Sequence, residues 1–362
     1  MIVKFGAFGD ILMTTPLLTA LRGAYPDAHI TWIVDPKYAQ AIDAHPLVDE
    51  VLLWVNQYWP LMRSTRPRNW LKNWFGLRWM SDTVRLKSRL RSRFDTYISF
   101  HAEQRPFLLR AASPDFSIGV FESAREGNSN YESLYTKAFT PKDFPAHQTD
   151  LYLLPLNALA LPPAKDKRMT MGYTAEDARV VNDLLEKEGV GPAPVVLVPR
   201  TTWESKCWPV ERWSALGDAL AEDGHRIILM GSSSEAGAIE RVTSNMRSAP
   251  LMLPGSLTFR QSAALIARAS LCISSDTAPM HIAAAVGTRY VSLFGPTPPR
   301  RYAPLAGRGL SLIQPVPCGP CMKMTCPNPP ETRMLCMNLL TVSEVLNAAR
   351  AVLRDNSEEA AP

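Results

Sequence analysis

The stretch 271–296, LCISSDTAPMHIAAAVGTRYVSLFGP, decides the fold of this chain. Its apolar run 271–274 predicts a buried strand, and 280–286 predicts an apolar helix that ends at Gly287. The run 290–294 predicts the next strand. A strand, a helix and a second strand in this order form a unit whose two strands run parallel. We therefore expect an α/β protein built on parallel sheets.

Polar residues stand where the first of these strands meets the helix. Asp276 and Thr277 follow the strand, and Pro279 falls where the first helical turn tolerates proline. Open α/β sheets bind ligands at the carboxyl ends of their strands, and the start of a helix attracts anions. The segment alone is equally compatible with a helix cap that has no further role.

Length and composition indicate a globular chain of two domains. The chain has 362 residues, an apolar fraction of 46% and a formal net charge of +5. No apolar run reaches the roughly 18 residues that a membrane-spanning helix needs. Asp10 and Pro16 interrupt any signal-peptide core at the N-terminus. We therefore expect a cytoplasmic protein.

Strand and helix patterns alternate twice along the chain, which is typical of doubly wound sheets. The first series occupies residues 1–160 and begins with a strand at 2–5, a glycine turn at 6–10 and a helix at 11–21. Either Asp10 or one of Thr14 and Thr15 is expected to cap that helix. A segment rich in proline and leucine at 151–167 is interpreted as the linker. The second series occupies 170–340, and a last helix is expected at 341–354.

Residues 56–93 interrupt the alternation with a basic, aromatic insertion. It holds ten Lys or Arg, among them Arg63, Arg66, Arg68 and Lys72, against the single acid Asp82. Three interpretations stay open: a segment that lies on an anionic membrane surface, a wall that binds a phosphorylated or acidic acceptor, and a solvated helical insertion. No nucleic-acid motif accompanies these residues, so we expect no nucleic-acid partner.

Three strands of the second series end in polar loops. These loops hold Thr201, Thr202 and Lys206, then 232–235 with Glu235, then Asp276 and Thr277. Parallel strands end at one edge of a sheet, so the loops should converge. Hydroxyls, a lysine and helix starts suit a diphosphate, and a carboxylate suits ribose hydroxyls. No Walker lysine motif or pair of metal-binding acids is present, so we expect phosphate binding without a metal.

Four cysteines, Cys318, Cys321, Cys326 and Cys336, cluster near the end of the second series with the spacing C-x2-C-x4-C-x9-C. Four thiolates this close in sequence could hold a structural Zn²⁺ or iron ion. The alternatives are a loop of free thiols or disulfides that form on purification.

Three motifs along the chain resemble those of bacterial ADP-heptose:lipopolysaccharide heptosyltransferases, glycosyltransferase family 9. GDILMTTP at 9–16 matches the family's G-D-x-x-x-T-x-P element, and TTWESKCWP at 201–209 matches its T-T-x-x-x-K-x-W-P loop. DTAPMHIAAA at 276–285, with FGPT at 294–297, resembles the donor-site motif. One departure is visible, because Ala278 stands where the family commonly has glycine.

The resemblance implies a GT-B fold, in which two Rossmann-like domains face each other across a cleft. The C-terminal domain would bind the ADP-sugar donor, the N-terminal domain the acceptor, and the last helix would cross back to the N-terminal domain. Asp10 would be the general base, with Lys206 assisting catalysis. The donor site implied by the family motifs and by the loops above comprises Thr201, Thr202, Lys206, Glu235, Asp276, Thr277, Ala278 and His281.

The leading hypothesis is an inverting transfer of heptose from ADP-heptose to a lipopolysaccharide-core or related glycan acceptor, without a catalytic cofactor. The protein would then work in the cytoplasm, peripherally on the inner face of the inner membrane. A GT-B transferase that uses another nucleotide sugar is an alternative, because Ala278 adds a methyl group near the donor. A nucleotide-sugar epimerase would not need the basic insertion, and a binding protein without turnover would not need Asp10 and Lys206.

Overall fold

The computed structural model describes residues 1–54, 88–90, 93–101, 106–121, 132–140, 143 and 145–355. The chain forms two compact units. The first comprises Met1–Ala7, Leu17–Pro145 and Asp150–Lys165, and the second comprises Phe8–Pro16, Ala146–Thr149 and Asp166–Pro362. No helix among the described residues is long and apolar enough to cross a membrane.

The first unit is built on a parallel sheet of six strands in the order β3-β2-β1-β4-β5-β6. These strands are β1 (Ile2–Val3), β2 (Thr31–Val34), β3 (Glu50–Leu53), β4 (Thr96–Ser99), β5 (Phe116–Val120) and β6 (Lys137–Phe139). The connecting segments are α1 (Phe8–Ala24), the 3₁₀ helices η1 (Pro36–Ala41) and η4 (Glu132–Leu134), α4 (Pro106–Ala112), α5 (Gln148–Leu153) and α6 (Pro155–Ala158). Buried side chains such as Val3, Ile33 and Tyr97 form the core around the sheet.

Helix α1 begins at Phe8, earlier than the sequence predicts, so Asp10 lies in its first turn and not at its cap. Pro16 lies inside the helix and has no N–H for the carbonyl of Leu12. The hydroxyl Oγ1 of Thr15 donates to that carbonyl instead, at 2.7 Å. A local hydroxyl thus satisfies the acceptor that proline leaves open.

The second unit repeats the design with a parallel sheet in the order β12-β11-β10-β7-β8-β9. Its strands are β7 (Val195–Val198), β8 (Ile227–Gly231), β9 (Leu251–Pro254), β10 (Leu271–Ser275), β11 (Tyr290–Phe294) and β12 (Gly309–Ile313). The helices are α7 (Ala175–Lys187), η6 (Glu204–Lys206), α8 (Val210–Glu222), η7 (Ser233–Glu235), α9 (Ala236–Ser244), α10 (Phe259–Arg268), α11 (Ala278–Ala285), α12 (Pro299–Tyr302), η8 (Pro330–Thr332), α13 (Leu335–Asn338) and α14 (Val342–Arg354).

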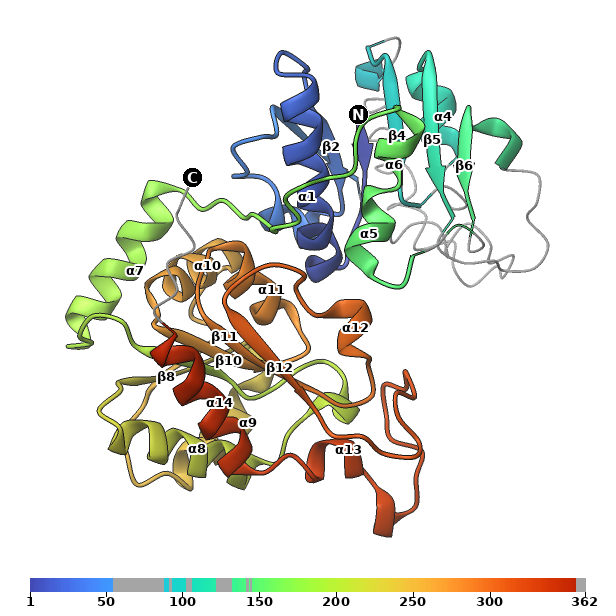
Figure 1. Ribbon diagram of the computed structural model, residues 1–362. Helices are drawn as coiled ribbons and strands as arrows, with labels where there is room; N and C mark the ends of the chain where they lie inside the picture. The colour runs from blue at the N-terminus through green and yellow to red at the C-terminus, as the bar shows by residue number, and fades with distance from the viewer. Residues whose placement is uncertain are drawn as a thin grey trace, which may run out of the picture. The chain divides into compact units, whose positions relative to one another are not determined.

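Helices cover both faces of the second sheet. In Figure 1, α7, α10 and α11 lie on one face, and α8, α9 and α14 lie on the other. Thr174 and Thr341 form capping boxes at the starts of α7 and α14, and the hydroxyl of each accepts from the backbone of the N3 residue. Helix α14 packs against α8 and β11 of the second unit, and the crossing back to the N-terminal domain that the family resemblance implies stays a prediction.

Both sheets have the same strand order when each is counted from its own first strand. That order, 3-2-1-4-5-6, is the order of Rossmann-type sheets, so the prediction of two Rossmann-like, doubly wound domains is confirmed. The order reverses between β7 and β10 in the second sheet, and ligands bind outside the strand ends at such a point. The loops that follow β7 and β10 are therefore the first place to look for a site.

The segment 151–167, interpreted from the sequence as a linker, is helical over much of its first half. Helices α5 and α6 occupy it, and Leu151, Tyr152 and Leu156 are buried. Those side chains belong to a packed core, which is why the linker interpretation is wrong for this part.

Candidate functional site

Lys206 and Asp276 form a buried ion pair at the switch point of the second sheet. Lys206 ends η6 in the loop after β7, and Asp276 directly follows β10. Lys206 Nζ donates to Asp276 Oδ2 at 2.6 Å and to the Asp276 carbonyl oxygen at 3.2 Å. The two side chains are only 12% and 6% exposed. Removal of either partner would leave the other charge buried without compensation, which is costly.

Two neighbours hold this pair in place. Thr297, in the loop after β11, donates from Oγ1 to Asp276 Oδ2 at 2.6 Å. The ring of Trp203 lies 4.5 Å from Lys206 Nζ and attracts the cation through its π face. An ammonium group has three N–H donors, and Asp276 takes two of those of Lys206. Among the described residues no acceptor takes the third donor, which leaves it to the Trp203 ring or to an anion.

The start of α11 lies next to the pair in sequence. Thr277 occupies the N-cap position, but its side chain makes no capping hydrogen bond. Pro279 has no N–H, and within the part of the chain that is described no carbonyl accepts from the backbone N–H of Thr277 or Ala278. Two open amides at the positive end of a helix favour an anion. The interpretation of Asp276 and Thr277 as a mere helix cap therefore loses its support.

His281 connects α11 with the start of α1 inside the second unit. The imidazole is 4% exposed, and its Nδ1 has no hydrogen-bond partner among the described residues. A Cβ placed on Gly9 would lie 2.7 Å from the Cδ2 of His281, so only glycine permits this close packing. The ring therefore lies directly against the residue that precedes Asp10.

The charges around His281 show that the predicted residues share one electrostatic environment. Burial lowers the pKa of His281, whereas the carboxylates of Asp276 and Asp10 act to raise it, and the Lys206 ammonium again lowers it. The imidazole is thus neutral near pH 7. Asp10, Lys206, Asp276 and His281, four of the residues predicted from sequence, come together in the second unit.

His147 is a further member of this environment, and no sequence pattern singled it out. Its Nδ1 accepts from the backbone N–H of Thr149 at 3.0 Å, so its Nε2 carries the proton and donates to the Ala303 carbonyl at 2.8 Å. The bond to Thr149 is local to the loop, whereas the bond to Ala303 joins segments that are distant in the sequence.

The other predicted donor residues occupy less constrained positions. Thr201 is half-buried and Thr202 is exposed. Glu235 serves a capping box, in which its Oε2 accepts from the N–H of Ser232 at 2.7 Å and from the Ser232 hydroxyl at 2.8 Å. The contact between Glu235 and a ribose thus stays a prediction.

Known proteins with the same pattern identify the family. The family model described as glycosyltransferase family 9 (heptosyltransferase) matches residues 84–331. The chain belongs to glycosyltransferase family 9. The resemblance inferred from the motifs is therefore confirmed, and the protein is a glycosyltransferase.

Individual relatives agree with this assignment. The chain is 28% identical over 337 residues to lipopolysaccharide heptosyltransferase 1 of Pseudomonas aeruginosa. The matched region covers 90% of this chain and 86% of the relative. A solved family 9 glycosyltransferase from Veillonella parvula superposes with a TM-score of 0.79 at 20% identity, over 97% of this chain and 96% of that one. Escherichia coli heptosyltransferase WaaC with ADP-2-deoxy-2-fluoro heptose superposes with a TM-score of 0.67 at 22% identity, over 97% and 98% of the two chains. These structures support the GT-B class of fold.

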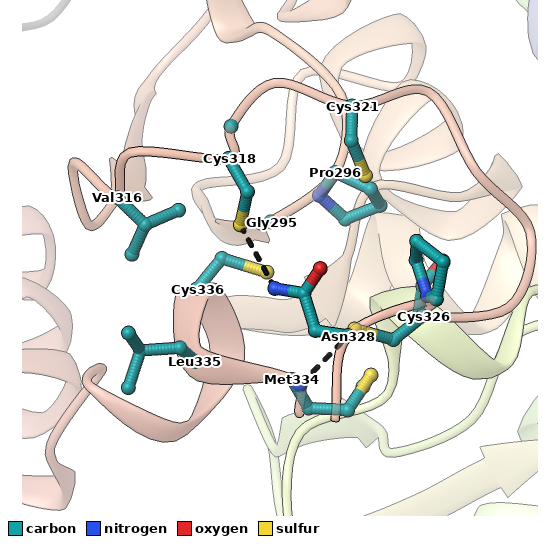
Figure 2. A pocket seen from close by; sticks show the side chains of 13 residues that line it. Gly295, Pro296, Val316, Cys318, Cys321, Cys326, Asn328, Met334, Leu335 and Cys336 are labelled. Carbon is teal, nitrogen blue, oxygen red and sulfur yellow. Dashed lines mark hydrogen bonds between the residues drawn. The ribbon is translucent and has the colours of Figure 1, made fainter. Parts of the chain in front are cut away.

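The four clustered cysteines of this family 9 transferase line one cavity. Figure 2 shows Cys318, Cys321, Cys326 and Cys336 around it. Asn328 Nδ2 donates to the sulfur of Cys318, and the Met334 N–H donates to the sulfur of Cys326, both at 3.3 Å. All four are free thiols.

The predicted metal site is not supported by this arrangement. Within the described parts of the chain, no group of three or more His, Cys, Asp or Glu side chains is placed so that it could hold a metal ion. The four sulfurs have suitable chemistry for Zn²⁺ or iron, but they do not converge as ligands. We therefore derive no metal chemistry from them.

The predicted acceptor or membrane surface, Arg63, Arg66, Arg68 and Lys72, lies outside the described residues, as does most of the insertion at 56–93. Its three interpretations stay predictions. At the edge of the insertion, Arg89 forms an ion pair with Glu50 on β3 at 2.9 Å.

Proposed function

We propose that this protein transfers heptose from ADP-heptose, with inversion, to a hydroxyl of a lipopolysaccharide-core or related glycan. The observation that carries the proposal is the Lys206–Asp276 pair beside the open amides of Thr277 and Ala278, at the switch point of the second sheet. Relatives named as lipopolysaccharide heptosyltransferases and a WaaC structure with an ADP-heptose analogue support the choice of donor.

The site residues divide the reaction between them. Asp10 would accept the proton of the attacking hydroxyl while the new bond forms at the anomeric carbon of the sugar. The bond from that carbon to the diphosphate breaks at the same time, and negative charge develops on the departing ADP. The third N–H of Lys206 and the start of α11 would stabilise that charge.

The remaining residues would orient the donor. The hydroxyls of Thr201 and Thr202 suit phosphate oxygens, and Glu235 suits the ribose. His281, neutral through burial, would accept or donate one hydrogen bond from Nδ1 towards the sugar–phosphate. Because these groups supply the positive field without Mg²⁺, we infer that catalysis needs no metal or other cofactor.

A lipid-linked acceptor places the reaction at a membrane surface. We infer that the protein works in the cytoplasm, peripherally on the inner face of the inner membrane, and that its basic insertion at 56–93 meets anionic lipid or acceptor phosphate. A flotation assay with anionic and neutral vesicles tests this. Equal flotation with both would remove the membrane part of the proposal.

A donor screen tests the proposed reaction and its main alternative. Ala278 adds a methyl group at the first position of α11, so a different nucleotide sugar is the second candidate donor. Purified enzyme is incubated with ADP-heptose, ADP-glucose and UDP-sugars, together with deacylated core oligosaccharide, and the product is analysed by mass spectrometry and NMR. We expect a mass increase of one heptose with ADP-heptose only. Transfer from another donor supports the alternative, and ADP binding without transfer supports a binding protein.

A further inference from the structure

The cysteine cavity borders the loops that bear Lys206 and Thr297, and nothing in the proposed reaction uses it. We call residues 314–336, which follow β12, the cysteine loop. The cavity is lined by the four cysteines of that loop and also by Ser205, Gly295 and Pro296. Ser205 precedes Lys206, and Pro296 precedes Thr297. The cavity therefore touches the two loops that supply the partners of Asp276.

Hydrogen bonds join the cysteine loop to the turn that bears Lys206. The N–H of Ser205 donates to the Met324 carbonyl at 3.1 Å, and the Ser205 hydroxyl donates to the Lys323 carbonyl. Ser205 is 2% exposed, so these bonds are shielded from water. The neighbouring Glu204 accepts from Arg333, at the far end of the loop, at 2.6 Å.

The same loop holds the segment that bears Thr297. The N–H of Met322 donates to the Pro296 carbonyl at 2.9 Å. On the opposite side, a Cβ on Gly295 would lie 2.5 Å from Met337 Sδ and 3.1 Å from Cys336 Sγ, so the segment is packed tightly against the end of the loop. Lys206 and Thr297, which meet on Asp276, are thus both anchored to the cysteine loop.

We propose that the cysteine loop positions the donor site, with Ser205 as the positioning residue, and that chemical modification of the cavity thiols weakens donor binding. The cavity has a volume of about 20 Å³, which is room for about one water molecule. Cys318 is exposed, so a substituent on its sulfur can point into solvent. Cys321, Cys326 and Cys336 are half-buried, and the cavity has no room for a substituent on their sulfurs, so the loop must move away from Ser205 and Pro296. This inference rests on the proposed function, because it concerns the same donor site.

A pair of buried serines tests the positioning role. Ser205→Ala removes the hydroxyl bond to the cysteine loop. Ser214→Ala is the matched control, because Ser214 is also 2% exposed and its hydroxyl donates to a backbone carbonyl, that of Val242 at 2.7 Å, on another side of the unit. ADP affinity is measured by calorimetry, and thermal unfolding is recorded for both.

We expect Ser205→Ala to weaken ADP binding about 5- to 10-fold, which corresponds to one buried hydrogen bond, and to raise the donor KM more than it lowers kcat. Ser214→Ala should lower the unfolding temperature by about as much as Ser205→Ala does, because each variant loses one buried hydrogen bond. It should leave ADP affinity within about 2-fold of the wild type. Equal ADP affinities in the two variants would overturn the inference. Wild-type protein that binds no ADP would instead overturn the proposed function.

Methyl methanethiosulfonate provides a second test that does not depend on the serine variants. The reagent converts a thiol to a methyl disulfide, Cys–S–S–CH₃, and releases methanesulfinic acid, so that the new S–S bond replaces the S–H bond. The control is a variant with all four loop cysteines changed to serine, which retains the buried Cys207 and Cys272. We expect the reagent to weaken ADP binding at least about 5-fold in the wild type and not in the control. Unchanged affinity of the modified wild type, with modification of the loop verified by mass spectrometry, would overturn the inference.

Discussion

Two polar loop regions of the second unit satisfy the hydrogen bonds of their side chains in different ways. The loop after β8 satisfies itself, because Ser232 and Glu235 bond to each other across four residues. The loops after β7, β10 and β11 depend on one another, since Lys206 and Thr297 both bond to Asp276. The contacts of the first region are local in sequence, whereas those of the second region form only when the sheet is assembled.

The difference indicates which polar residues act as a site. A local cap satisfies most of its donors and acceptors within itself and is exposed, so it has little left to bind a ligand tightly. The interlocked loops are largely buried, and among the described residues nothing accepts from the third lysine N–H or the two helix amides, which lie in a positive field. Substitutions in the interlocked loops should therefore change turnover and stability strongly, and substitutions in the β8 loop weakly.

Lys206→Met should give the largest effect of the substitutions that separate the two regions. The variant keeps the length of the side chain but removes the ammonium that we propose stabilises the leaving diphosphate. We expect kcat to fall at least about 100-fold and ADP affinity to fall about 10-fold. Steady-state kinetics and calorimetry measure both. A variant with kcat within about 3-fold of the wild type would remove Lys206 from the mechanism.

Asp276→Asn should destabilise the second unit while keeping its shape. The asparagine can still accept from Thr297, but Lys206 loses its counter-charge in a buried position. We expect the free energy of unfolding to fall by about 3 kcal/mol, measured by urea titration. Glu176→Gln on exposed α7, which removes a partner of Arg179, is the control and should leave the unfolding midpoint nearly unchanged. Equal midpoints for the two variants would contradict the interlocked description.

Acid sensitivity limits the pH range in which the two regions can be compared. Burial lowers the pKa of His45, in the first unit, from 6.5 to about 4. The unfolded chain therefore binds a proton below pH 6.5 that the folded chain does not bind until about pH 4, so stability falls as the pH falls through this window. We expect His45 alone to cost about 3 kcal/mol between pH 7 and pH 4.

The control for this prediction is His45→Leu, whose unfolding free energy should vary less over the same pH range. An equally steep pH dependence in that variant would assign the acid sensitivity to other groups. Burial also lowers the pKa of His281, so the second unit should likewise lose stability as the pH falls.

Glu235→Gln should have the smallest effect. The carboxamide can still accept from Ser232 and preserve the cap, so only the proposed charged contact to the donor ribose is lost. We expect the donor KM to rise about 3- to 5-fold and kcat to stay the same. A fall in kcat comparable with that of Lys206→Met would erase the distinction between the regions.

Much of the fold could be predicted because the buried strands carry continuous apolar runs. Strands β7, β10 and β11 are buried along their whole length, and the cap residues Thr174 and Thr341 are visible in the sequence. Strands β6, β9 and β12 were not predicted. They lie at the edges of their sheets, and they are short, as β6 and β9 are, or interrupted by a polar residue, as β12 is by Ser311.

The site was predictable only in part. Lys206, Asp276 and His281 stand in motifs, but the hydrogen bonds that reach Asp276 come from Thr297, 21 residues away, and from Lys206, 70 residues away. The start of α1 was misplaced because Gly9 and Pro16 look like helix breakers. Gly9 is required by the packing of His281, and the Thr15 hydroxyl compensates for Pro16. The packing of Gly9 against His281 cannot be read from local sequence, because the two residues lie far apart in the chain.

The central claim is that the carboxylate of Asp10 serves as the base of a reaction whose leaving group is held by Lys206. Asp10→Asn keeps the size of the side chain and its place in the first turn of α1 but cannot take up a proton. The measurement is the rate of heptose transfer from ADP-heptose together with ADP affinity for the same preparation. We expect transfer to fall at least about 1,000-fold while ADP binds within about 2-fold of the wild type. Transfer at the wild-type rate would contradict the claim.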